Sequence, residues 1–585
     1  MENNSLQKAQ QWASSISIDQ DSKAEIQKLI DENNLKEIEE RFYRDLEFGT
    51  GGMRSILGQG TNRMNKYNIR KATQAVSSAI LDTKPSSPKV AISYDSRRFS
   101  FEFAKEAATV FAANGIKALI YNRLNPVPLC SFAIRHHGCS AGVMVTASHN
   151  PPEYNGFKVF WSDGAQVTPP HDRNIINHFN SISDYGSIKF MDFEEGLSNG
   201  SIEWLDEKTE NAYYEAIKVK AVNYDLCQER GSELKIIYTA LHGTGLVPCT
   251  RALNDLGLTN IHLVDEQAQP DGDFPTVSSP NPENAEALEL AVKLMDKVDG
   301  DIALGTDPDT DRVGIAFRHN GEIIYLNGNQ IGVLMLHYIL SNHKEKGTLP
   351  TNPYFVKTIV TTPLQEKIAK AFNVEVENTL TGFKWICGRM NEIEKESPER
   401  NFLFATEESF GYLNHENVRD KDGVSSITLI SEIALYYKTK GMNLYQALDK
   451  IYEEYGFSHE SLLSLNFLGK EGAEKIARIM EQFRNSDMKE LCGLKLEKKE
   501  DYQEQVSTHC ATGDSSKIEL PKSNVLGYYF ENNNRLFLRP SGTEPKIKFY
   551  VMIQESEGSL KEKKEKAEKK TKEILKFIEE QAQKA

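Results

Sequence analysis

The sequence predicts an α/β fold divided into several domains. Two patterns carry this prediction: strand-like apolar runs alternate with helix-like periods through the first three quarters of the chain, and three of these strands end at polar loops. The chain has 585 residues, too many for one hydrophobic core, so roughly three to five domains are expected. Because α/β sheets usually bind ligands at the carboxyl ends of strands, the three loops are candidate sites.

The first alternating stretch leads to a serine. Its elements are expected in this order: strand 89–93, helix 101–114, strand 117–121, helix 128–137 and strand 141–145. The last strand runs into Thr146-Ala147-Ser148-His149-Asn150-Pro151. A buried strand that delivers a serine into a tight polar turn is suited to presenting a hydroxyl for chemistry, although a helix cap or a plain turn also explains these residues.

The neighbours of Ser148 narrow its chemistry. The G-x-S-x-G pattern of a nucleophile elbow is absent, since Ala147 and His149 flank the serine. Adjacent side chains on an extended chain point apart. We therefore expect His149 to support the loop by hydrogen bonding rather than to polarise Ser148.

The second stretch leads to three aspartates. Its strands are expected at 234–241, 260–264 and 301–305, and its helices at 246–256 and 283–298. The last strand ends at Asp307-Pro308-Asp309-Thr310-Asp311-Arg312, and strands 312–317 and 322–326 then flank a hairpin turn. The alternating carboxylates at 307, 309 and 311 can converge on one hard cation such as Mg²⁺.

The aspartate loop has three other interpretations. An EF-hand fails, because Arg312 replaces the glycine at position six and Arg318 stands where the bidentate glutamate belongs. A surface turn seldom combines three carboxylates after a buried strand. The segment from Asp309 to Val313 also fits the aspartyl nucleophile loop of haloacid-dehalogenase-type phosphatases, which needs no phosphoserine.

The third stretch leads to another polar loop. Helices are expected at 330–342 and 363–372, and strands at 355–360, 374–377 and 401–405, the last of which ends at residues 406–412. From about residue 457 this rhythm is lost and the chain becomes highly charged. A strand is expected at 535–538, and residues 559–585 fit one amphipathic helix.

Two more loops have the composition of anion-binding sites. In Arg539-Pro540-Ser541-Gly542-Thr543-Glu544-Pro545-Lys546, two cations and two hydroxyls surround a glycine that lets backbone N–H groups approach a phosphate. The Gly-rich segment 48–54, which ends in Arg54, can cradle phosphate in the same way, although that motif alone is weak.

Composition excludes several classes of partner. The net charge of −15 argues against a nucleic-acid or anionic-membrane partner. No run approaches the ~18 apolar residues of a membrane span, and the polar N-terminus resembles no signal peptide. The seven cysteines form no C-x-x-C pair, which fits a reducing cytoplasm better than a zinc site or a disulfide framework. A cytoplasmic protein is expected.

Five motifs in this order resemble the α-D-phosphohexomutase superfamily, with the closest match to its longer phosphoglucomutase/phosphomannomutase-type members. They are residues 48–54, 146–151, 307–312, 407–411 and 539–546. The resemblance implies three related α/β/α domains with mixed sheets plus a smaller C-terminal α+β domain around a central cleft. The corresponding boundaries are 1–207 for the phosphoserine domain, 208–323 for the metal-binding domain, 324–456 for the sugar-binding domain and 457–585 for the phosphate-binding domain.

The resemblance also implies the role of each site residue. Ser148 would be the phosphorylated serine and would hold Mg²⁺ together with Asp307, Asp309 and Asp311. The implied catalytic cations are Arg54, Arg312 and Lys158. Lys158 is the candidate general base, because neighbouring cations can lower the pKa of a lysine. The expected supports of the serine loop are Thr146, His149 and Asn150.

The implied substrate contacts come from the later loops. Glu407 and Ser409 match the sugar-binding loop. The matches to the phosphate-binding loop are Arg539, Ser541, Gly542 and Thr543. Lys384 is a further candidate for substrate binding, as are Arg419 and Lys421.

The expected activity is that of an intramolecular phosphotransferase. A phosphoglucomutase would interconvert glucose 1-phosphate and glucose 6-phosphate, with glucose 1,6-bisphosphate as intermediate and activator. The segment Glu407-Glu408-Ser409-Phe410-Gly411 resembles the glucose-preferring form of the sugar loop. Phosphomannomutase and phosphopentomutase activities are alternatives within the superfamily. An aspartyl-type phosphatase and a catalytically inactive sugar-phosphate sensor are alternatives outside it, and the oligomeric state stays open.

Overall fold

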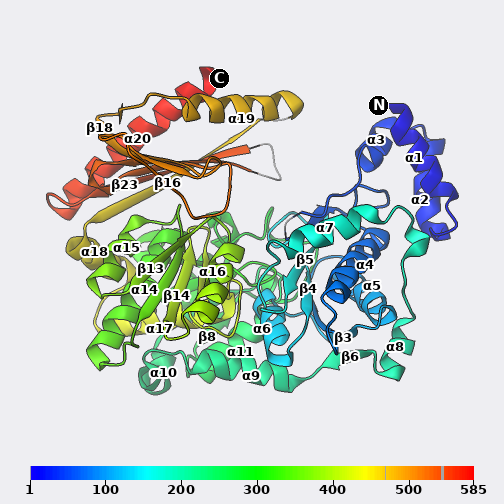
Figure 1. Ribbon diagram of the computed structural model, residues 1–585. Helices are drawn as coiled ribbons and strands as arrows, with labels where there is room; N and C mark the ends of the chain where they lie inside the picture. Colours follow the sequence, from blue (N-terminus) through cyan, green and yellow to red (C-terminus); the bar gives the residue numbers. More distant parts are fainter. Residues whose placement is uncertain (1, 50, 468, 542–545, 585) are drawn as a thin grey trace. The chain divides into compact units, whose positions relative to one another are not determined.

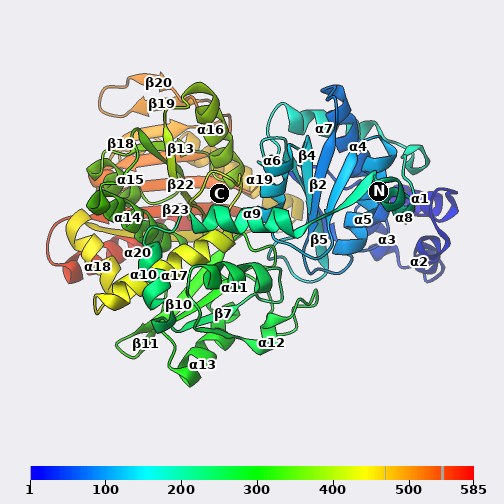
Figure 2. The ribbon, with the colours of Figure 1, turned by 90° about the horizontal axis from the view of Figure 1, so that it is seen from below.

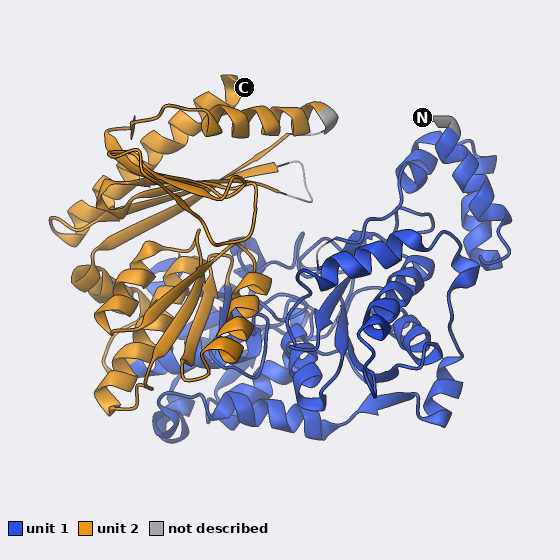
Figure 3. Cartoon of the chain, viewed as in Figure 1, with its two compact units in different colours: residues 1–326, 411–436 blue, residues 327–410, 437–585 orange. Residues whose placement is uncertain are grey.

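The computed structural model describes residues 2–49, 51–467, 469–541 and 546–584 (Figure 1). The chain divides into two compact units, which Figure 3 shows in different colours. Unit 1 comprises residues 1–326 and 411–436, and unit 2 comprises residues 327–410 and 437–585. None of the helices in the described part of the chain combines the length and apolar character needed to span a lipid bilayer.

Three helices open unit 1: α1 (Glu2–Ser14), α2 (Gln20–Asp31) and α3 (Leu35–Phe42). The side chains of Asp19 and Asn34 accept hydrogen bonds from the first turns of α2 and α3, which fixes where these helices begin. The helices have a small core of their own, in which the indole of Trp12 meets the ring of Tyr67 edge-on at 5.3 Å. Tyr67 belongs to α4 (Lys66–Asp82), so this core ties the helices to the first sheet layer.

The first sheet has the strand order β1-β5-β4-β2-β3-β6. Its strands are β1 (Gly52–Ile56), β2 (Lys89–Tyr94), β3 (Lys117–Tyr121), β4 (Ala141–Val145), β5 (Tyr154–Trp161) and β6 (Ile202–Leu205). Strands β4, β2, β3 and β6 are parallel, and β5 runs antiparallel to β4 and β1. Helices α4, α5 (Ser100–Ala113) and α7 (His171–Ser181) share one core with this sheet, and α6 (Val127–His137) packs on β2 and β4 (Figure 2). The predicted elements and their mixed sheet are confirmed.

The second sheet of unit 1 has the order β11-β10-β9-β7-β8. Its strands are β7 (Ile236–Thr239), β8 (Ile261–Leu263), β9 (Ile302–Thr306), β10 (Val313–His319) and β11 (Glu322–Tyr325). His319 pairs with Glu322, so the predicted hairpin is confirmed. The helix α11 (Leu246–Asp255) lies where it was expected, whereas a single helix over 283–298 is wrong. A 3₁₀ turn at Ala285–Leu288 comes first, because Leu288 leaves the helical region before α13 (Glu289–Val298) begins.

Unit 2 contains a parallel arrangement of β13 (Glu375–Thr379), β12 (Pro353–Thr358) and β14 (Asn401–Glu407). The helices in this part are α14 (Gly328–Lys346), α15 (Pro363–Ala371), α16 (Phe383–Glu396) and α18 (Leu444–Tyr455). Asn327 and Gln330 form a capping box that starts α14, and Pro363 occupies the first turn of α15. The strand β14 ends at Glu407, so the predicted sugar loop follows a strand end as expected.

The C-terminal part of unit 2 is an antiparallel sheet with the order β16-β23-β22-β21-β18-β19-β20, and β17 (Glu490–Leu491) pairs with β18. Its long strands are β16 (Phe457–Asn466), β18 (Leu494–Asp501), β21 (Leu526–Phe530), β22 (Arg535–Pro540) and β23 (Lys546–Glu555). The edge hairpin is β19 (Val506–His509) and β20 (Ser515–Lys517). Helices α19 (Gly469–Arg484) and α20 (Leu560–Lys584) pack on β23, which confirms the predicted C-terminal helix. The domain boundaries and the central cleft stay predictions.

A buried ion-pair network connects the two parts of unit 2. Lys357 on β12 donates to Glu366 Oε1 at 2.8 Å, and Arg535 on β22 donates to both oxygens of Glu366 at 3.0 and 2.7 Å. Burial acts to raise the pKa of Glu366, but the charges and hydrogen bonds of Lys357 and Arg535 outweigh burial and hold that pKa well below its usual range. The carboxylate therefore stays charged and fixes β22 against β12.

Candidate active site

The serine loop leaves β4 through an unusual backbone conformation. Ser148 has a φ of 53°, in the left-handed region that side chains other than glycine rarely adopt. Its N–H donates to Thr146 Oγ1 at 2.8 Å, while the N–H of Thr146 donates to the carbonyl oxygen of Gly156 at 3.1 Å. The predicted supporting role of Thr146 agrees with these contacts. Such strained residues concentrate at functional sites.

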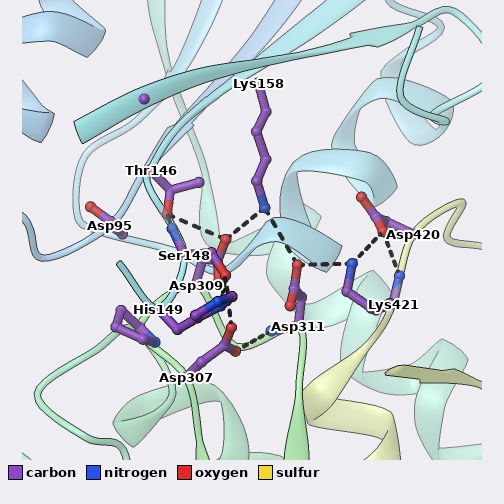
Figure 4. A network of polar contacts seen from close by, with 12 residues as sticks. Asp95, Thr146, Ser148, His149, Lys158, Asp307, Asp309, Asp311, Asp420 and Lys421 are labelled. Carbon is purple, nitrogen blue, oxygen red and sulfur yellow. Dashed lines mark hydrogen bonds and ion pairs between the residues drawn. The ribbon is translucent and has the colours of Figure 1, made fainter. Parts of the chain in front are cut away.

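The side chains of Ser148 and His149 converge, contrary to the expectation that they point apart (Figure 4). Ser148 Oγ lies 3.1 Å from His149 Nδ1. The expectation assumed an extended chain, and the left-handed φ of Ser148 turns the backbone instead. Burial and the nearby charges of Arg312 and Arg54 hold the pKa of His149 well below its usual range, so the imidazole that faces the hydroxyl is neutral.

The three aspartates form a buried cluster at the end of β9. Asp307, Asp309 and Asp311 are 0–2% exposed, and their carboxylate oxygens lie within 4.8 Å of one another. Ser148 Oγ donates to Asp307 Oδ2 at 3.1 Å, across 159 residues of sequence. Thr146 Oγ1 donates to Asp309 Oδ2 at 3.3 Å. The structure thus brings the two strongest sequence motifs together.

The donor set of this cluster fits a hard cation. Asp309 Oδ1 and Asp311 Oδ1 are buried and accept no hydrogen bond. Burial and the neighbouring carboxylates of Asp311 and Asp309 raise the pKa of Asp307 well above its usual range. Buried carboxylate oxygens without donors are costly unless a positive charge compensates them. The three carboxylates together match the oxygen ligands that Mg²⁺ prefers.

Two lysines, Lys158 on β5 and Lys421, supply positive charge to the cluster. Lys158 Nζ donates to Asp309 Oδ2 at 2.7 Å and to Asp311 Oδ2 at 3.4 Å. Lys421 Nζ lies 3.2 Å from Asp311 Oδ2. Burial acts to raise the pKa of Asp311, but Lys421 and Lys158 outweigh it and hold that pKa below its usual range. In the described part of the chain, Lys158 and Lys421 therefore contact the predicted aspartate cluster, as does the serine loop.

The contacts of Lys158 raise its pKa, whereas a lowered value was expected from the sequence. Neighbouring cations were expected to lower its pKa, and burial also acts in that direction. The carboxylates of Asp309 and Asp311 outweigh both, however, and the pKa of Lys158 is raised above its usual value. Lys158 is therefore a charged ammonium group that faces the aspartates.

Arg54 and Arg312 both lie near the serine loop, where their charges act on His149. Arg54 on β1 donates to the side-chain oxygen of Asn150 at 2.8 Å, which agrees with a supporting role for Asn150. The backbone N–H of Arg312 donates to Asp307 Oδ1 at 3.0 Å, and its guanidinium pairs with Glu283. Arg312 is thus paired with an acidic side chain, Glu283, that no sequence motif indicated.

The predicted contact residues of the sugar loop and the phosphate loop belong to unit 2. Glu407 ends β14 and is 5% exposed, and the adjacent Glu408 accepts hydrogen bonds from Thr358 Oγ1 at 3.1 Å and Thr361 Oγ1 at 3.4 Å. Burial raises the pKa of Glu408, against the opposing charges of Lys548 and Arg539. The carboxyl of Glu408 in the predicted sugar loop is therefore close enough to the predicted phosphate loop for the charge of Arg539 to influence its pKa.

The structure describes four of the remaining predicted substrate residues, whose roles stay predictions. Arg539 sits on β22 opposite Lys548, and Ser541 donates its N–H to the carbonyl oxygen of Lys546 at 2.8 Å. Lys384 lies over the ring of Trp385, 4.9 Å from its centroid. Ser409 is half-buried after β14. Gly542 and Thr543 lie outside the described residues.

Sequence reasoning missed or misplaced several residues. Lys421 was considered for substrate contact, but it pairs with Asp311 in unit 1. Arg419 is buried and donates to the carbonyl oxygens of Glu416 and Val418 in its own loop. Asp95 and Arg97 were not selected, although both follow directly on a predicted buried strand, which is the signal that could have found them.

Comparison with protein families agrees with this geometry. Three models described as phosphoglucomutase/phosphomannomutase, alpha/beta/alpha domains I, II and III, match residues 45–186, 211–321 and 327–455. The chain belongs to this family. The matched segments contain the serine loop, the aspartate cluster and the predicted sugar loop.

Individual relatives support the same assignment. A phosphoglucomutase of Staphylococcus saprophyticus is 36% identical over 510 residues, which cover 87% of this chain and 90% of that protein. One of Staphylococcus epidermidis is 37% identical over 522 residues, covering 88% and 92%. The fold is similar to that of the exocytosis-sensitive phosphoprotein pp63/parafusin from Paramecium, with a TM-score of 0.69, 18% identity and coverage of 92% and 96%.

Proposed function

We propose that this protein is a phosphoglucomutase that interconverts glucose 1-phosphate and glucose 6-phosphate through a phosphoserine at Ser148. The observation that carries this proposal is the 3.1 Å contact between Ser148 Oγ and Asp307 Oδ2 within a buried cluster of three aspartates. An aspartyl-type phosphatase needs no serine at this position. The relatives named phosphoglucomutase, at 36–37% identity, favour glucose among the possible sugars.

The aspartate cluster provides the metal-dependent part of the proposed chemistry. Asp307, Asp309 and Asp311, together with Ser148, would hold Mg²⁺. The ion supplies electrostatic stabilisation of phosphoryl oxygens when it is bound. Lys158 adds a positive charge beside the aspartate cluster, and its ion pairs with Asp309 and Asp311 hold the ammonium group in place. Most of the catalysis in phosphoryl transfer comes from such positioning and charge stabilisation.

His149 is the better candidate for handling the proton of Ser148. When phosphoserine transfers its group, the bond between phosphorus and Ser148 Oγ breaks and a bond to the sugar hydroxyl oxygen forms. The sugar hydroxyl loses its proton in this step, and the serine oxygen gains one. When the other phosphoryl group returns to Ser148, the serine oxygen loses its proton and the sugar oxygen that is released gains one. His149 Nδ1 lies 3.1 Å from Oγ, within the reach required of an acid or base.

The residues of unit 2 provide the proposed sugar and phosphate contacts. Glu407 and Ser409 would contact ring hydroxyls, and Lys384 would assist them. The proposed grip on the non-transferred phosphate comes from Arg539, Ser541, Gly542 and Thr543. Glucose and mannose differ at carbon 2, so contacts to the 3- and 4-hydroxyls alone do not separate them. Glucose 1,6-bisphosphate is the proposed intermediate and activator.

A coupled assay tests the proposal. Conversion of glucose 1-phosphate is followed with Mg²⁺ and a trace of glucose 1,6-bisphosphate, with mannose 1-phosphate and ribose 1-phosphate in parallel. Ser148→Ala should lose nearly all activity, whereas Ser140→Ala, just before the same strand, should retain it. Release of free phosphate by Ser148→Ala without isomerisation would instead favour the phosphatase.

We further propose a cytoplasmic location and a small-molecule sugar phosphate as the partner. The seven cysteines all lie in the part of the chain that the structure describes and form no disulfide bond, and five of them are buried. Free thiols persist in reducing compartments.

A further inference from the structure

A single buried guanidinium holds the backbone of the serine loop. Arg97 follows β2, and its side chain has 0% exposed surface. Its Nη1 donates to the carbonyl oxygens of Pro151 at 2.9 Å and Tyr154 at 3.0 Å. Its Nη2 donates to the carbonyl oxygen of Ser148 at 2.6 Å and to that of Asn150. One side chain therefore serves four carbonyl groups between residues 148 and 154.

The loop needs outside donors because its own backbone supplies few of them; the N–H of Tyr154 also donates to the carbonyl oxygen of Pro151, at 3.1 Å. Pro151 and Pro152 contribute carbonyl groups but no N–H groups. Leaving a buried acceptor without a donor costs about 1–3 kcal/mol. A guanidinium offers five N–H donors in a planar fork, whereas a lysine ammonium is a point charge with three donors. The arrangement of four acceptors around one side chain is thus specific to arginine.

Arg97 is itself fixed by its surroundings. Its Nε lies 3.5 Å from Asp95 Oδ2, and its backbone N–H donates to Asp95 Oδ1 at 2.9 Å. Ser100 Oγ donates to the same Asp95 oxygen at 2.7 Å. The guanidinium carbon lies 4.9 Å from the centroid of the Phe274 ring. The neighbouring Arg98 is different, since its side chain is 53% exposed and pairs with Asp273.

We propose that Arg97 is a positioning residue for phosphoryl transfer at Ser148. By fixing the carbonyl groups that follow the serine, it maintains the left-handed backbone at Ser148, and this backbone places Oγ 3.1 Å from both Asp307 Oδ2 and His149 Nδ1. Arg97 donates to backbone carbonyl oxygens and not to the hydroxyl, so it acts through the loop. This inference rests on the proposed phosphoserine chemistry.

Two explanations of Arg97 give different expectations for a lysine variant. If Arg97 served only to balance the buried carboxylates of Asp95, Asp307 and Asp309, lysine would keep the charge and most of the activity. If the fork positions the loop, lysine would leave carbonyl groups without donors and Oγ would move. A misplacement of about 1 Å typically costs about 10²-fold in rate.

The test compares Arg97→Lys with the matched control Arg98→Lys. Steady-state kinetics with glucose 1-phosphate should show kcat lowered about 10²-fold in Arg97→Lys, because the loop is displaced. KM should stay within about twofold, because the proposed sugar and phosphate contacts are elsewhere. Hydrogen exchange should be faster in peptides covering residues 146–156 and unchanged in the C-terminal sheet. Arg98→Lys should match the unaltered protein in all three measurements.

Defined results would overturn the proposal. A kcat of Arg97→Lys within about threefold of the unaltered protein would leave only a role for charge. A large loss of kcat without faster exchange in residues 146–156 would also contradict positioning through the loop. If Arg97→Lys does not fold, Asp95→Asn removes one support of the guanidinium, and normal exchange and kcat in that variant would overturn the proposal as well.

The exchange measurement separates this proposal from the proposed function. If the unaltered protein shows no mutase activity but Arg97→Lys still loosens residues 146–156, the phosphoserine mechanism fails while the structural role of Arg97 holds. If the unaltered protein is an active mutase and the exchange of residues 146–156 is unchanged in Arg97→Lys, the positioning role alone fails.

Discussion

Replacing Lys158 by methionine is expected to destabilise the metal-free protein and to strengthen metal binding. Methionine keeps much of the aliphatic side chain and removes the ammonium group. The side chain of Lys158 is 13% exposed, and its partners Asp309 and Asp311 are 0% and 2% exposed. Removing one partner of a buried ion pair costs about 3–5 kcal/mol, because the other charge stays buried. Lys421 still neutralises Asp311, so about 3 kcal/mol is expected.

Metal should offset part of this loss. With the ammonium gone, the site is more negative, and two unit charges 4 Å apart interact by about 4 kcal/mol at an effective dielectric constant of 20. We therefore expect Mg²⁺ to bind Lys158→Met at least about tenfold more tightly than the unaltered protein, a difference of about 1.4 kcal/mol. Turnover should still fall, because the variant lacks the ammonium charge that we propose stabilises the transferring phosphoryl group.

Urea unfolding in EDTA and in Mg²⁺ provides the assay. The control is Lys117→Met, which removes the same ammonium group from an ion pair with Glu203. The side chains of Lys117 and Glu203 are 41% and 56% exposed, so this variant should lose only about 0–1 kcal/mol of unfolding free energy. Equal stability of the two variants in EDTA would refute the argument. So would a Mg²⁺-induced gain in stability that is the same in Lys158→Met as in the unaltered protein.

Three further predictions follow from other parts of the structure. Glu366→Gln should lower the unfolding free energy of unit 2 by about 3–5 kcal/mol at pH 7. Because the folded pKa of Glu366 is below its ordinary value of 4.5, this difference should shrink as the pH falls below about 4.5 and vanish below the folded pKa. A difference in urea titrations that does not change with pH would contradict the prediction. Gly156→Ala places a Cβ 2.4 Å from the carbonyl oxygen of Thr146, so the serine loop must shift. The unfolding free energy should fall by about 1–3 kcal/mol, and kcat should also fall. Unchanged kinetics would count against tight packing at this position. Trp12→Ala should cost about 3–5 kcal/mol and speed hydrogen exchange in residues 2–42; equal protection of these helices would rule out Trp12 as their core.

Much of the fold and of the site was predictable because its signals are local. Strands such as 141–145 and 301–305 are short apolar runs that end in polar residues, so their position and the loops after them can be recognised without contacts. The alternation of Asp307, Asp309 and Asp311 likewise indicates a cation site by itself. A single 3₁₀ turn before α13 was missed, because its difference from a helix depends on the backbone angles of one residue.

The sequence by itself determined which residues are candidates for the chemistry, and the tertiary structure decided their contacts and charge states. The pairing of Lys158 with Asp309 raises the pKa of the lysine, and this depends on burial and on a partner 151 residues away. The approach of His149 to Ser148 depends on a positive φ that no local residue preference reveals. The four carbonyl groups bound by Arg97 belong to a loop that only folding brings beside it. The protonation of a side chain, the convergence of two side chains and the positioning of a loop depend on contacts that form only on folding. A sequence pattern does not show these contacts.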